Sequence, residues 1–115
     1  MEVNLGDVVL CEFYFSDFHE TKLRPVLVFK DNLPFDDFVG IPLSSQIGRL
    51  SDDEIVITQS DLSEGMLPKR SKVMLRKTFV VSKQVIVKKY GGLTVHTFEM
   101  IHKNFCQYFE CSGKC

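Results

Sequence analysis

The 115-residue chain has ordinary apolar content (44%) and charged content (25%), which is typical of one domain with its own hydrophobic core. It contains no run of about eighteen apolar residues. Its first residues lack the basic and apolar segments of a signal peptide. These features argue against a transmembrane helix and lead us to expect a cytosolic protein.

The net charge of −1 conceals a marked asymmetry along the chain. Residues 1–67 carry 13 acidic side chains and four Lys or Arg, a net of −9. Residues 68–115 carry two acidic side chains and ten Lys or Arg, a net of +8. This asymmetry is typical of a basic face that binds nucleic acid, or of two halves that attract each other, and both can hold together.

Short runs of branched and aromatic residues, bounded by turn residues, predict several β-strands before residue 90. The predicted strands are 8–15, 26–29, 38–43, 54–58, 72–77 and 85–87. Residues 60–65 resemble one helical turn closed by a glycine, and Gly91–Gly92 is expected to interrupt the regular structure. Cys11 lies within the first strand, where we expect it to be a small core residue.

The last segment has the period of a helix. Its apolar residues recur at spacings of three and four, and Thr94 is placed to cap the first turn. These apolar residues are Val95, Phe98, Ile101, Phe105 and Tyr108. Several short strands followed by one helix predict a single domain, mainly β, in which a small, strongly curved β-barrel is covered by a C-terminal helix.

Arg24 comes directly before Pro25 and the apolar run Val26–Phe29. Proline is tolerated at the first residue of a strand, so Arg24 is expected at the mouth of a rigid, doubly buried strand. A guanidinium held in this way can present its planar donors to a phosphate. The alternative interpretation is a solvated charge at a strand edge.

Three of the four cysteines fall in the last ten residues, at Cys106, Cys111 and Cys115. Together with His102 they could form a metal cluster, but their spacing matches no familiar zinc pattern. We therefore expect no metal site, reduced thiols, and a flexible tail over residues 110–115.

Four segments carry patterns that belong together. They are Gly6-Asp7 followed by a strand, Leu23-Arg24-Pro25-Val26-Leu27-Val28, Ile41-Pro42-Leu43-Ser44-Ser45-Gln46, and Gly65 to Leu75 with its Ser71-x-Val73-x-Leu75 end. In order and rough spacing they resemble the MazF/PemK/Kid family of toxin endoribonucleases from bacterial toxin–antitoxin pairs. The resemblance covers most of residues 6–109. It implies an SH3-like barrel with a C-terminal helix, usually a homodimer, that cleaves single-stranded RNA without a metal or other cofactor. It also implies a cognate antitoxin as partner.

The resemblance aligns Arg24 with the family's catalytic arginine and Ser44 with its catalytic threonine. Arg24 would stabilise the phosphate and the transition state, and the Ser44 hydroxyl would fix a phosphate oxygen. His19 lies roughly where some members carry a histidine. It is either a group that moves protons or an exposed loop residue, and Glu20 is the alternative carrier of the proton.

A further set of polar and basic residues is expected to bind RNA. This set is Lys22, Ser45, Gln46, Lys69, Arg70, Lys72, Arg76 and Lys77. Arg76 is a departure, because some members carry Asp or Glu there with a proposed acid/base role. An arginine can grip phosphate but stays protonated. Either His19 or Glu20 therefore moves the proton, or cleavage is weak or absent.

Two functions remain open at this point. A ribonuclease would leave a 2′,3′-cyclic phosphate, or the 3′-phosphate formed from it, and a 5′-hydroxyl. The alternative is a barrel of the same family that binds RNA or a protein without cutting, which the arginine at position 76 favours.

Overall fold

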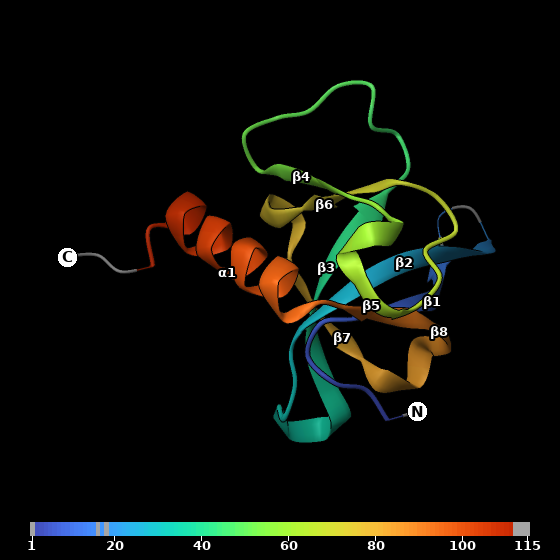
Figure 1. Cartoon of the computed structure of the whole chain (residues 1–115). Coiled ribbons are helices and arrows are strands. Elements are labelled where there is room, and N and C mark those ends of the chain that lie inside the picture. The colour runs from blue at the N-terminus through green and yellow to red at the C-terminus, as the bar shows by residue number, and fades with distance from the viewer. Residues whose placement is uncertain (1, 16, 18, 112–115) are drawn as a thin grey trace.

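A strongly curled antiparallel β-sheet forms the body of the molecule, and one long helix lies at its side (Figure 1). The computed structural model describes residues 2–15, 17 and 19–111. The strands are β1 (Asp7–Phe15), β2 (Glu20–Lys30), β3 (Asp37–Ser44), β4 (Glu54–Ile57), β5 (Leu62–Gly65), β6 (Ser71–Met74), β7 (Phe79–Ser82) and β8 (Ile86–Leu93). In the described part of the chain they are connected by the 3-10 turns η2 (Pro34–Asp36), η3 (Gln59–Asp61), η4 (Leu75–Lys77) and η5 (Lys83–Val85), and α1 spans Val95–Phe109.

The strand order in the sheet is β4-β6-β3-β2-β1-β8-β5, and β7 also pairs with β3. β3 is the strand that bends the sheet, because its first half pairs with β2 and β7 and its end pairs with β6. The predicted architecture, mainly β and strongly curved with a C-terminal helix, is confirmed.

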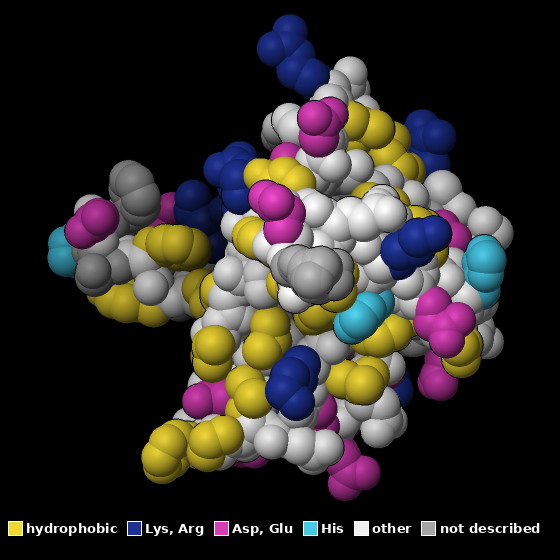
Figure 2. All heavy atoms as spheres, turned by 90° about the vertical axis from the view of Figure 1, so that its left-hand side faces the viewer, with side chains coloured by type: hydrophobic (Ala, Val, Ile, Leu, Met, Phe, Trp, Pro, Cys, Tyr) yellow, Lys and Arg dark blue, Asp and Glu magenta, His cyan; other side chains and the backbone are white. Residues whose placement is uncertain are grey.

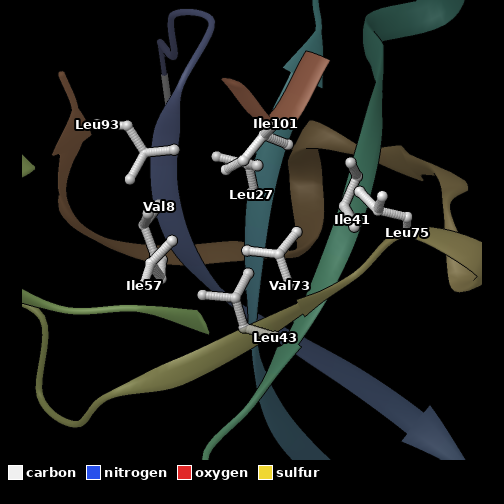
Figure 3. Packing of buried hydrophobic residues seen from close by; sticks show 9 residues of the cluster. All are labelled: Val8, Leu27, Ile41, Leu43, Ile57, Val73, Leu75, Leu93 and Ile101. Atoms are coloured by element: carbon white, nitrogen blue, oxygen red, sulfur yellow. The ribbon is translucent and has the colours of Figure 1, made fainter. Parts of the chain in front are cut away.

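The part of the β1–β2 hairpin around Val8, Val9 and Val26–Val28 is buried on both faces, each in its own core. The larger core lies under α1 and is shown in Figure 3. Its buried members are Val8, Leu27, Ile41, Leu43, Ile57, Val73, Leu75, Leu93 and Ile101. The second core contains Val3, Val9, Cys11, Val26, Val28, Phe38, Val81 and Ile86. Consecutive residues of one strand therefore enter opposite cores, as the alternation of side chains in a strand requires. The predicted burial of Cys11 is confirmed.

Some strand boundaries differ from the prediction. β2 begins at Glu20, well before Arg24, because the chain from Glu20 onward pairs with β1. The predicted strand 72–77 ends at Met74, where η4 turns the chain into the unpredicted strand β7. The predicted helical turn at 60–65 is η3 followed by β5.

Gly91 and Gly92 lie inside β8 instead of interrupting it, which corrects the prediction. The reason is the close approach of β5. Gly65 pairs with Gly91, and a Cβ on Gly91 would lie 2.2 Å from the backbone oxygen of Glu64. Gly65 and Gly91 are thus required for the close packing of β5 on β8, whereas the sequence pattern predicts an interruption at Gly91.

Helix α1 begins as predicted. The Thr94 side chain accepts a hydrogen bond from the Thr97 N–H at 3.1 Å and caps the first turn. Of the predicted apolar face, Ile101 is fully buried, whereas Val95 is 74% exposed and Tyr108 39% exposed. The helix projects past the sheet, so its far end is only partly covered (Figure 1).

Figure 2 shows the side of the molecule toward which α1 projects. Hydrophobic side chains lie there in separate groups among Lys, Arg, Asp and Glu. No helix in the described part of the chain is long and apolar enough to cross a membrane. The predicted flexible tail falls mostly on residues 112–115, Cys115 included, which lie outside the described residues.

Candidate nucleic-acid groove

A groove of about 1050 Å³ opens where β2 and β3 separate. The β2–β3 ladder ends at the pair Val26 and Pro42, and Pro25 is the next residue of β2. Prolines have no N–H to donate, so two prolines at this point favour the end of the ladder. β3 then pairs with β6 through Leu43 and Ser44. The strands diverge, and the space between them becomes the floor of the groove.

Arg24 lies in the middle of β2 and not at its mouth, because β2 starts earlier than predicted. It stands opposite Cys11 in the β1–β2 register and on the same face of β2 as Val26 and Val28. That face forms the second core, so Arg24 follows directly where the core ends. Its side chain lines the groove and is exposed, with Nη1 donating to the Leu23 carbonyl at 3.2 Å.

Ser44 is the last residue of β3 and also lines the groove. Its Oγ accepts a hydrogen bond from the Gln46 N–H at 3.1 Å, so it forms the strand-end turn and still keeps its own proton to donate. Ser45 and Gln46 are exposed and line the same groove. The structure thus brings Arg24 together with all three polar residues that sequence reasoning placed at the end of β3.

The electrostatics of the groove are one-sided. Its described lining contains the cations Arg24, Lys69 and Lys77, and it contains neither an acidic residue nor a histidine. Lys69 comes from the loop before β6, where Ser71 Oγ donates to its carbonyl at 3.1 Å, and Lys77 ends η4. A concave surface with only positive side chains attracts polyanions.

Five of the predicted residues lie outside this lining, namely His19, Lys22, Arg70, Lys72 and Arg76. His19 is exposed at the turn between β1 and β2, in a left-handed conformation with φ of 52°. Lys22 forms an ion pair with Glu20 at 3.3 Å, and its Nζ lies 5.7 Å from the centroid of the Phe15 ring. Arg70 is exposed next to the groove residue Lys69.

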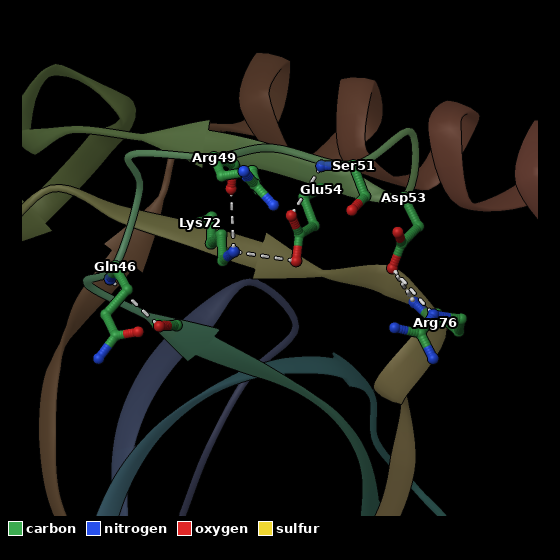
Figure 4. A network of polar contacts seen from close by, with 8 residues as sticks. Gln46, Arg49, Ser51, Asp53, Glu54, Lys72 and Arg76 are labelled. Carbon is green, nitrogen blue, oxygen red and sulfur yellow. Dashed lines mark hydrogen bonds and ion pairs between the residues drawn. The ribbon is translucent and has the colours of Figure 1, made fainter.

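Lys72 holds the loop after β3 in place, as Figure 4 shows. Its ammonium contacts Glu54 Oε2 at 3.1 Å and donates to the Arg49 carbonyl at 3.3 Å, and its side chain is only 14% exposed. Two hydrogen bonds lower the pKa of the Glu54 carboxyl. The larger effect comes from the Ser51 N–H and the smaller from the Lys72 ammonium. Lys72 also borders a smaller hollow of about 480 Å³, which adjoins the groove through Ser44 and Lys77.

Arg76 also holds a carboxylate, that of Asp53. Asp53 Oδ2 accepts the Arg76 backbone N–H at 3.3 Å and lies 3.6 Å from its Nε (Figure 4). The Asp53 side chain is 6% exposed, and the Asp53 backbone carbonyl accepts a hydrogen bond from the Leu75 N–H at 2.9 Å. Arg76 therefore partners a buried carboxylate, and it is not part of the groove lining.

Sequence reasoning missed two features of this region. Asp53 lies in a run of acids, Asp52-Asp53-Glu54, that gave no sign of which one would be buried. The aromatic residues of β1 that line the groove were read as ordinary strand residues. An uninterrupted aromatic triplet at the end of a predicted strand, Phe13-Tyr14-Phe15, was the available signal.

The described cysteines, Cys11, Cys106 and Cys111, lie outside the groove lining. Burial raises the pKa of the Cys11 thiol to about 11. Cys106 Sγ lies 4.0 Å from His102 Nδ1, and a hydrogen bond with Cys111 raises the pKa of the Cys106 thiol. Among the described residues, no group of three or more His, Cys, Asp and Glu is arranged to hold a metal ion.

The fold and the groove together define a small curled-sheet protein with a basic, concave surface beside an exposed arginine. The sequence profile of the PemK-like, MazF-like toxins of type II toxin–antitoxin systems matches residues 4–109. The chain therefore belongs to this family of toxins, as the four sequence segments predicted. No curated protein matches the sequence closely enough to count as a relative.

Solved structures share the fold at low sequence identity. A mycobacterial endoribonuclease in complex with its cognate antitoxin superposes with a TM-score of 0.73 and 17% identity, covering 95% of this chain and 96% of that one. The Mycobacterium tuberculosis toxin MazF-mt6 superposes with a TM-score of 0.68 and 16% identity, covering 90% of this chain and 96% of that one. A second mycobacterial endoribonuclease superposes with a TM-score of 0.68 and 19% identity, covering 96% of this chain and 94% of that one. The predicted barrel of the MazF/PemK type is thereby confirmed.

Proposed function

We propose that this toxin is a metal-independent endoribonuclease that cleaves single-stranded RNA at selected sequences. The observation that carries the proposal is the acid-free groove in which Arg24 and Ser44 face the same space. RNA is a polyanion, and such a groove binds it through its phosphates. The family and the endoribonucleases that share its fold support the same activity.

In the proposed reaction the 2′-hydroxyl of one nucleotide attacks the adjacent phosphorus, and the 5′-oxygen leaves. The products are a 2′,3′-cyclic phosphate, or the 3′-phosphate formed from it, and a 5′-hydroxyl. Arg24 stabilises the charge that develops on the phosphoryl oxygens, because its planar donors lie just before the part of β2, Val26–Val28, that is buried on both faces. The Ser44 hydroxyl donates a hydrogen bond to a phosphoryl oxygen and so fixes the group that reacts.

Proton transfer is assigned to His19. An imidazole can both accept and donate a proton near neutral pH. His19 lies at the tip of the β1–β2 hairpin, whose strands also carry Arg24 and the aromatic lining. The neighbouring Glu20 is occupied by its ion pair with Lys22. Because His19 lies outside the groove lining, this assignment requires that it comes within reach of the scissile phosphate when RNA is bound.

The remaining RNA contacts divide by position. Ser45, Gln46, Lys69 and Lys77 line the groove, and Lys22 and Arg70 lie outside its lining, where they extend the positive surface for the flanking nucleotides. Lys72 and Arg76 contribute positive potential while they hold Glu54 and Asp53.

The partners follow from the same surfaces. We propose a cytoplasmic homodimer, since Tyr108 and Phe109 of α1 are 39% and 44% exposed and would be covered by a second copy. We also propose a cognate antitoxin whose acidic segment occupies the groove and competes with RNA. Sedimentation that finds only monomer at tens of micromolar would count against the dimer.

The activity is tested with purified protein and a long single-stranded RNA in EDTA. Primer extension should locate cuts at a repeated short sequence, and end labelling should find new 5′-hydroxyl ends. The Arg24→Ala protein is the control for contaminating nuclease. Cuts that persist unchanged in this control would refute the assignment of the activity to this groove.

A second function is kept because one observation favours it. Within the described lining no imidazole or carboxylate is available to move a proton. A toxin with this groove could bind RNA and block its use without cutting. In the same experiment intact RNA that nevertheless shifts in a gel would establish binding without cleavage.

A further inference from the structure

The C-terminal end of α1 brings two cysteines together. The helix ends at a left-handed residue, Glu110, with φ of 54° and ψ of 44°. The Glu110 N–H donates to the Gln107 carbonyl at 3.4 Å, and the Cys111 N–H donates to the Cys106 carbonyl at 2.9 Å. These two hydrogen bonds form the Schellman motif, in which the residue after the left-handed position folds back toward the helix residue five positions earlier. In this chain both of those positions are cysteine.

The motif also places the two thiols beside each other. In Schellman motifs the side chains at these two positions frequently contact each other, usually through apolar groups. In this chain the contact is made by thiols, and a hydrogen bond with Cys111 raises the pKa of the Cys106 thiol. Cys106 is half-buried, Cys111 is exposed, and both are free. The two sulfur atoms are therefore brought together by the backbone of the helix end.

A histidine lies one helical turn before Cys106. His102 Nδ1 lies 4.0 Å from Cys106 Sγ. The His102 ring stacks on Phe29, with ring centroids 5.6 Å apart and an interplanar angle of 23°. In the tautomer protonated at Nε2, the Nδ1 atom can accept the thiol proton, and the thiolate is the form of cysteine that attacks a disulfide. The helix end thus carries two adjacent thiols and a base beside one of them.

We propose that Cys106 and Cys111 are a modification site at which low-molecular-mass disulfides reversibly oxidise the two thiols to a disulfide within one chain. Cys111 reacts first, because it is exposed on the end of α1 that projects past the sheet (Figure 1). The proposal concerns this helix end alone and does not depend on the ribonuclease activity.

The reaction is thiol–disulfide exchange in two steps. The Cys111 thiolate attacks one sulfur of the small disulfide, whose S–S bond breaks and releases a thiolate. The Cys106 thiol then transfers its proton to His102, its sulfur attacks the Cys111 sulfur, and the second small thiolate leaves. The released thiolates take up the two protons. The two cysteines lose two electrons in total, and the small disulfide gains them as it becomes two thiols.

The disulfide would fix a turn that its own sequence does not favour. Glycine is the usual residue at the left-handed position, and Glu110 lacks its conformational freedom. A covalent link between Cys106 and Cys111 removes the open conformations of the turn, which also carries Tyr108 and Phe109. In a reducing compartment the thiols stay reduced, as the sequence predicts, and the disulfide forms when the fraction of small disulfides rises.

The test equilibrates the full chain in mixtures of reduced and oxidised glutathione, alkylates the free thiols and maps the remaining disulfides by mass spectrometry. Chymotrypsin cuts after Tyr108 and Phe109, so the peptides with Cys106 and Cys111 stay joined only if a disulfide links them. The Cys115→Ser protein keeps the proposed pair. The Cys111→Ser protein is the matched control, because it keeps Cys106 and Cys115 but lacks the thiol of the Schellman motif.

The Cys115→Ser protein should form the disulfide between Cys106 and Cys111 as its main oxidised product. Its equilibrium constant should be about tenfold or more above that of any disulfide in the Cys111→Ser protein, because the turn holds the reacting groups together. In the Cys115→Ser background, Glu110→Gly should raise the constant about fivefold and Glu110→Val should lower it about fivefold, since glycine favours the left-handed conformation and a β-branched residue opposes it. His102→Gln should reach the same equilibrium about tenfold more slowly.

Several results would overturn the proposal. The Cys115→Ser protein could give only mixed disulfides with glutathione, or only disulfides between two chains. The Cys111→Ser protein could form its disulfide as readily, which would mean that the turn has no role. Equal constants for Glu110→Gly and Glu110→Val would lead to the same conclusion, and an unchanged rate in His102→Gln would refute the transfer of the proton to His102. All of these measurements are made without RNA, so the proposed ribonuclease function stands or fails separately.

Discussion

The carboxylate of Asp53 and the guanidinium of Arg76 are partners across 23 residues of sequence, with Oδ2 and Nε 3.6 Å apart. The same Oδ2 accepts the Arg76 N–H at 3.3 Å, so the pair fixes the start of η4 as well as balancing charge. Lys77, the last residue of η4, lines the groove. The pair therefore positions one wall of the groove without forming part of it.

Arg76→Glu should destabilise the protein, although the family resemblance implies an acidic side chain at this position in some members. It places a second carboxylate beside the buried one, and like charges at short distance repel. Asp53→Ala should cost about 1–3 kcal/mol, because the Arg76 N–H loses its acceptor. Urea unfolding of both variants measures the effect. Arg76→Gln, which keeps a donor and removes the charge, is the control, and an Arg76→Glu protein as stable as the parent would contradict the role given to the pair.

Arg24→Ala should lower the single-turnover cleavage rate about a hundredfold, or about 3 kcal/mol, by removing preorganised charge from the scissile phosphate. Arg24→Lys should recover little of the rate, because a point charge does not reproduce the planar donors. Stability should be unaffected, since the side chain is exposed. If the parent and the Arg24→Ala protein cleaved at the same rate, Arg24 would have no catalytic role and would be an ordinary exposed strand residue.

The sequence was informative where the cause of the structure is local. The Thr94 cap depends on residues three positions apart, and the Arg24-Pro25 and Pro42-Leu43-Ser44 segments carry the prolines that favour the end of the β2–β3 ladder. That these two segments contribute to one site was predicted from the family resemblance alone, because the register between strands is not visible in one sequence.

What could not be predicted depends on pairing between distant segments. Lys72 looked like an RNA contact until β4 and β6 placed it against Glu54. The sequence pattern predicts an interruption of regular structure at Gly91. Gly91 is instead a strand residue without a Cβ because the backbone of Glu64, 27 residues away in sequence, packs against it. The alternation of side chains in β1 indicates which of them share a face. It does not indicate that the second core ends before Phe15, so that Phe15 lines the groove.

Thr94→Ala should destabilise the protein by about 1 kcal/mol, because the Thr97 N–H loses its cap. Thr94→Ser keeps the oxygen and should retain most of the stability. Thermal unfolding followed by far-ultraviolet circular dichroism reports the change. The cap would be unimportant if Ala and Ser gave the same midpoint.

The Asp31–Lys83 ion pair should give a pH dependence of stability with two limits. The Nζ and Oδ1 atoms are 2.7 Å apart, and the hydrogen bond from Lys83 lowers the pKa of Asp31, while Asp31 raises the pKa of Lys83. The contribution of Asp31 is complete above its unfolded pKa near 3.9 and is lost as the pH falls through the lowered value. That of Lys83 is complete below about 10.4 and is lost as the pH rises through the raised value. Asp31→Asn should remove both limits, as measured by urea unfolding from acid to alkaline pH.

Salt dependence of RNA binding should separate the cations of the groove from those that hold the structure. Lys69 and Lys77 line the groove, so Lys69→Gln and Lys77→Gln should each reduce the slope of log affinity against log salt by about 0.7, the value for one phosphate contact on a single strand. Lys103→Gln, on the exposed surface of α1 and outside the lining, should leave the slope unchanged. Lys72→Gln should lower stability through the loss of Glu54 and Arg49 contacts, with a smaller effect on the slope. If Lys103→Gln changed the slope as much as Lys69→Gln, RNA would be binding over the whole basic half of the chain and not in the groove between β2 and β3.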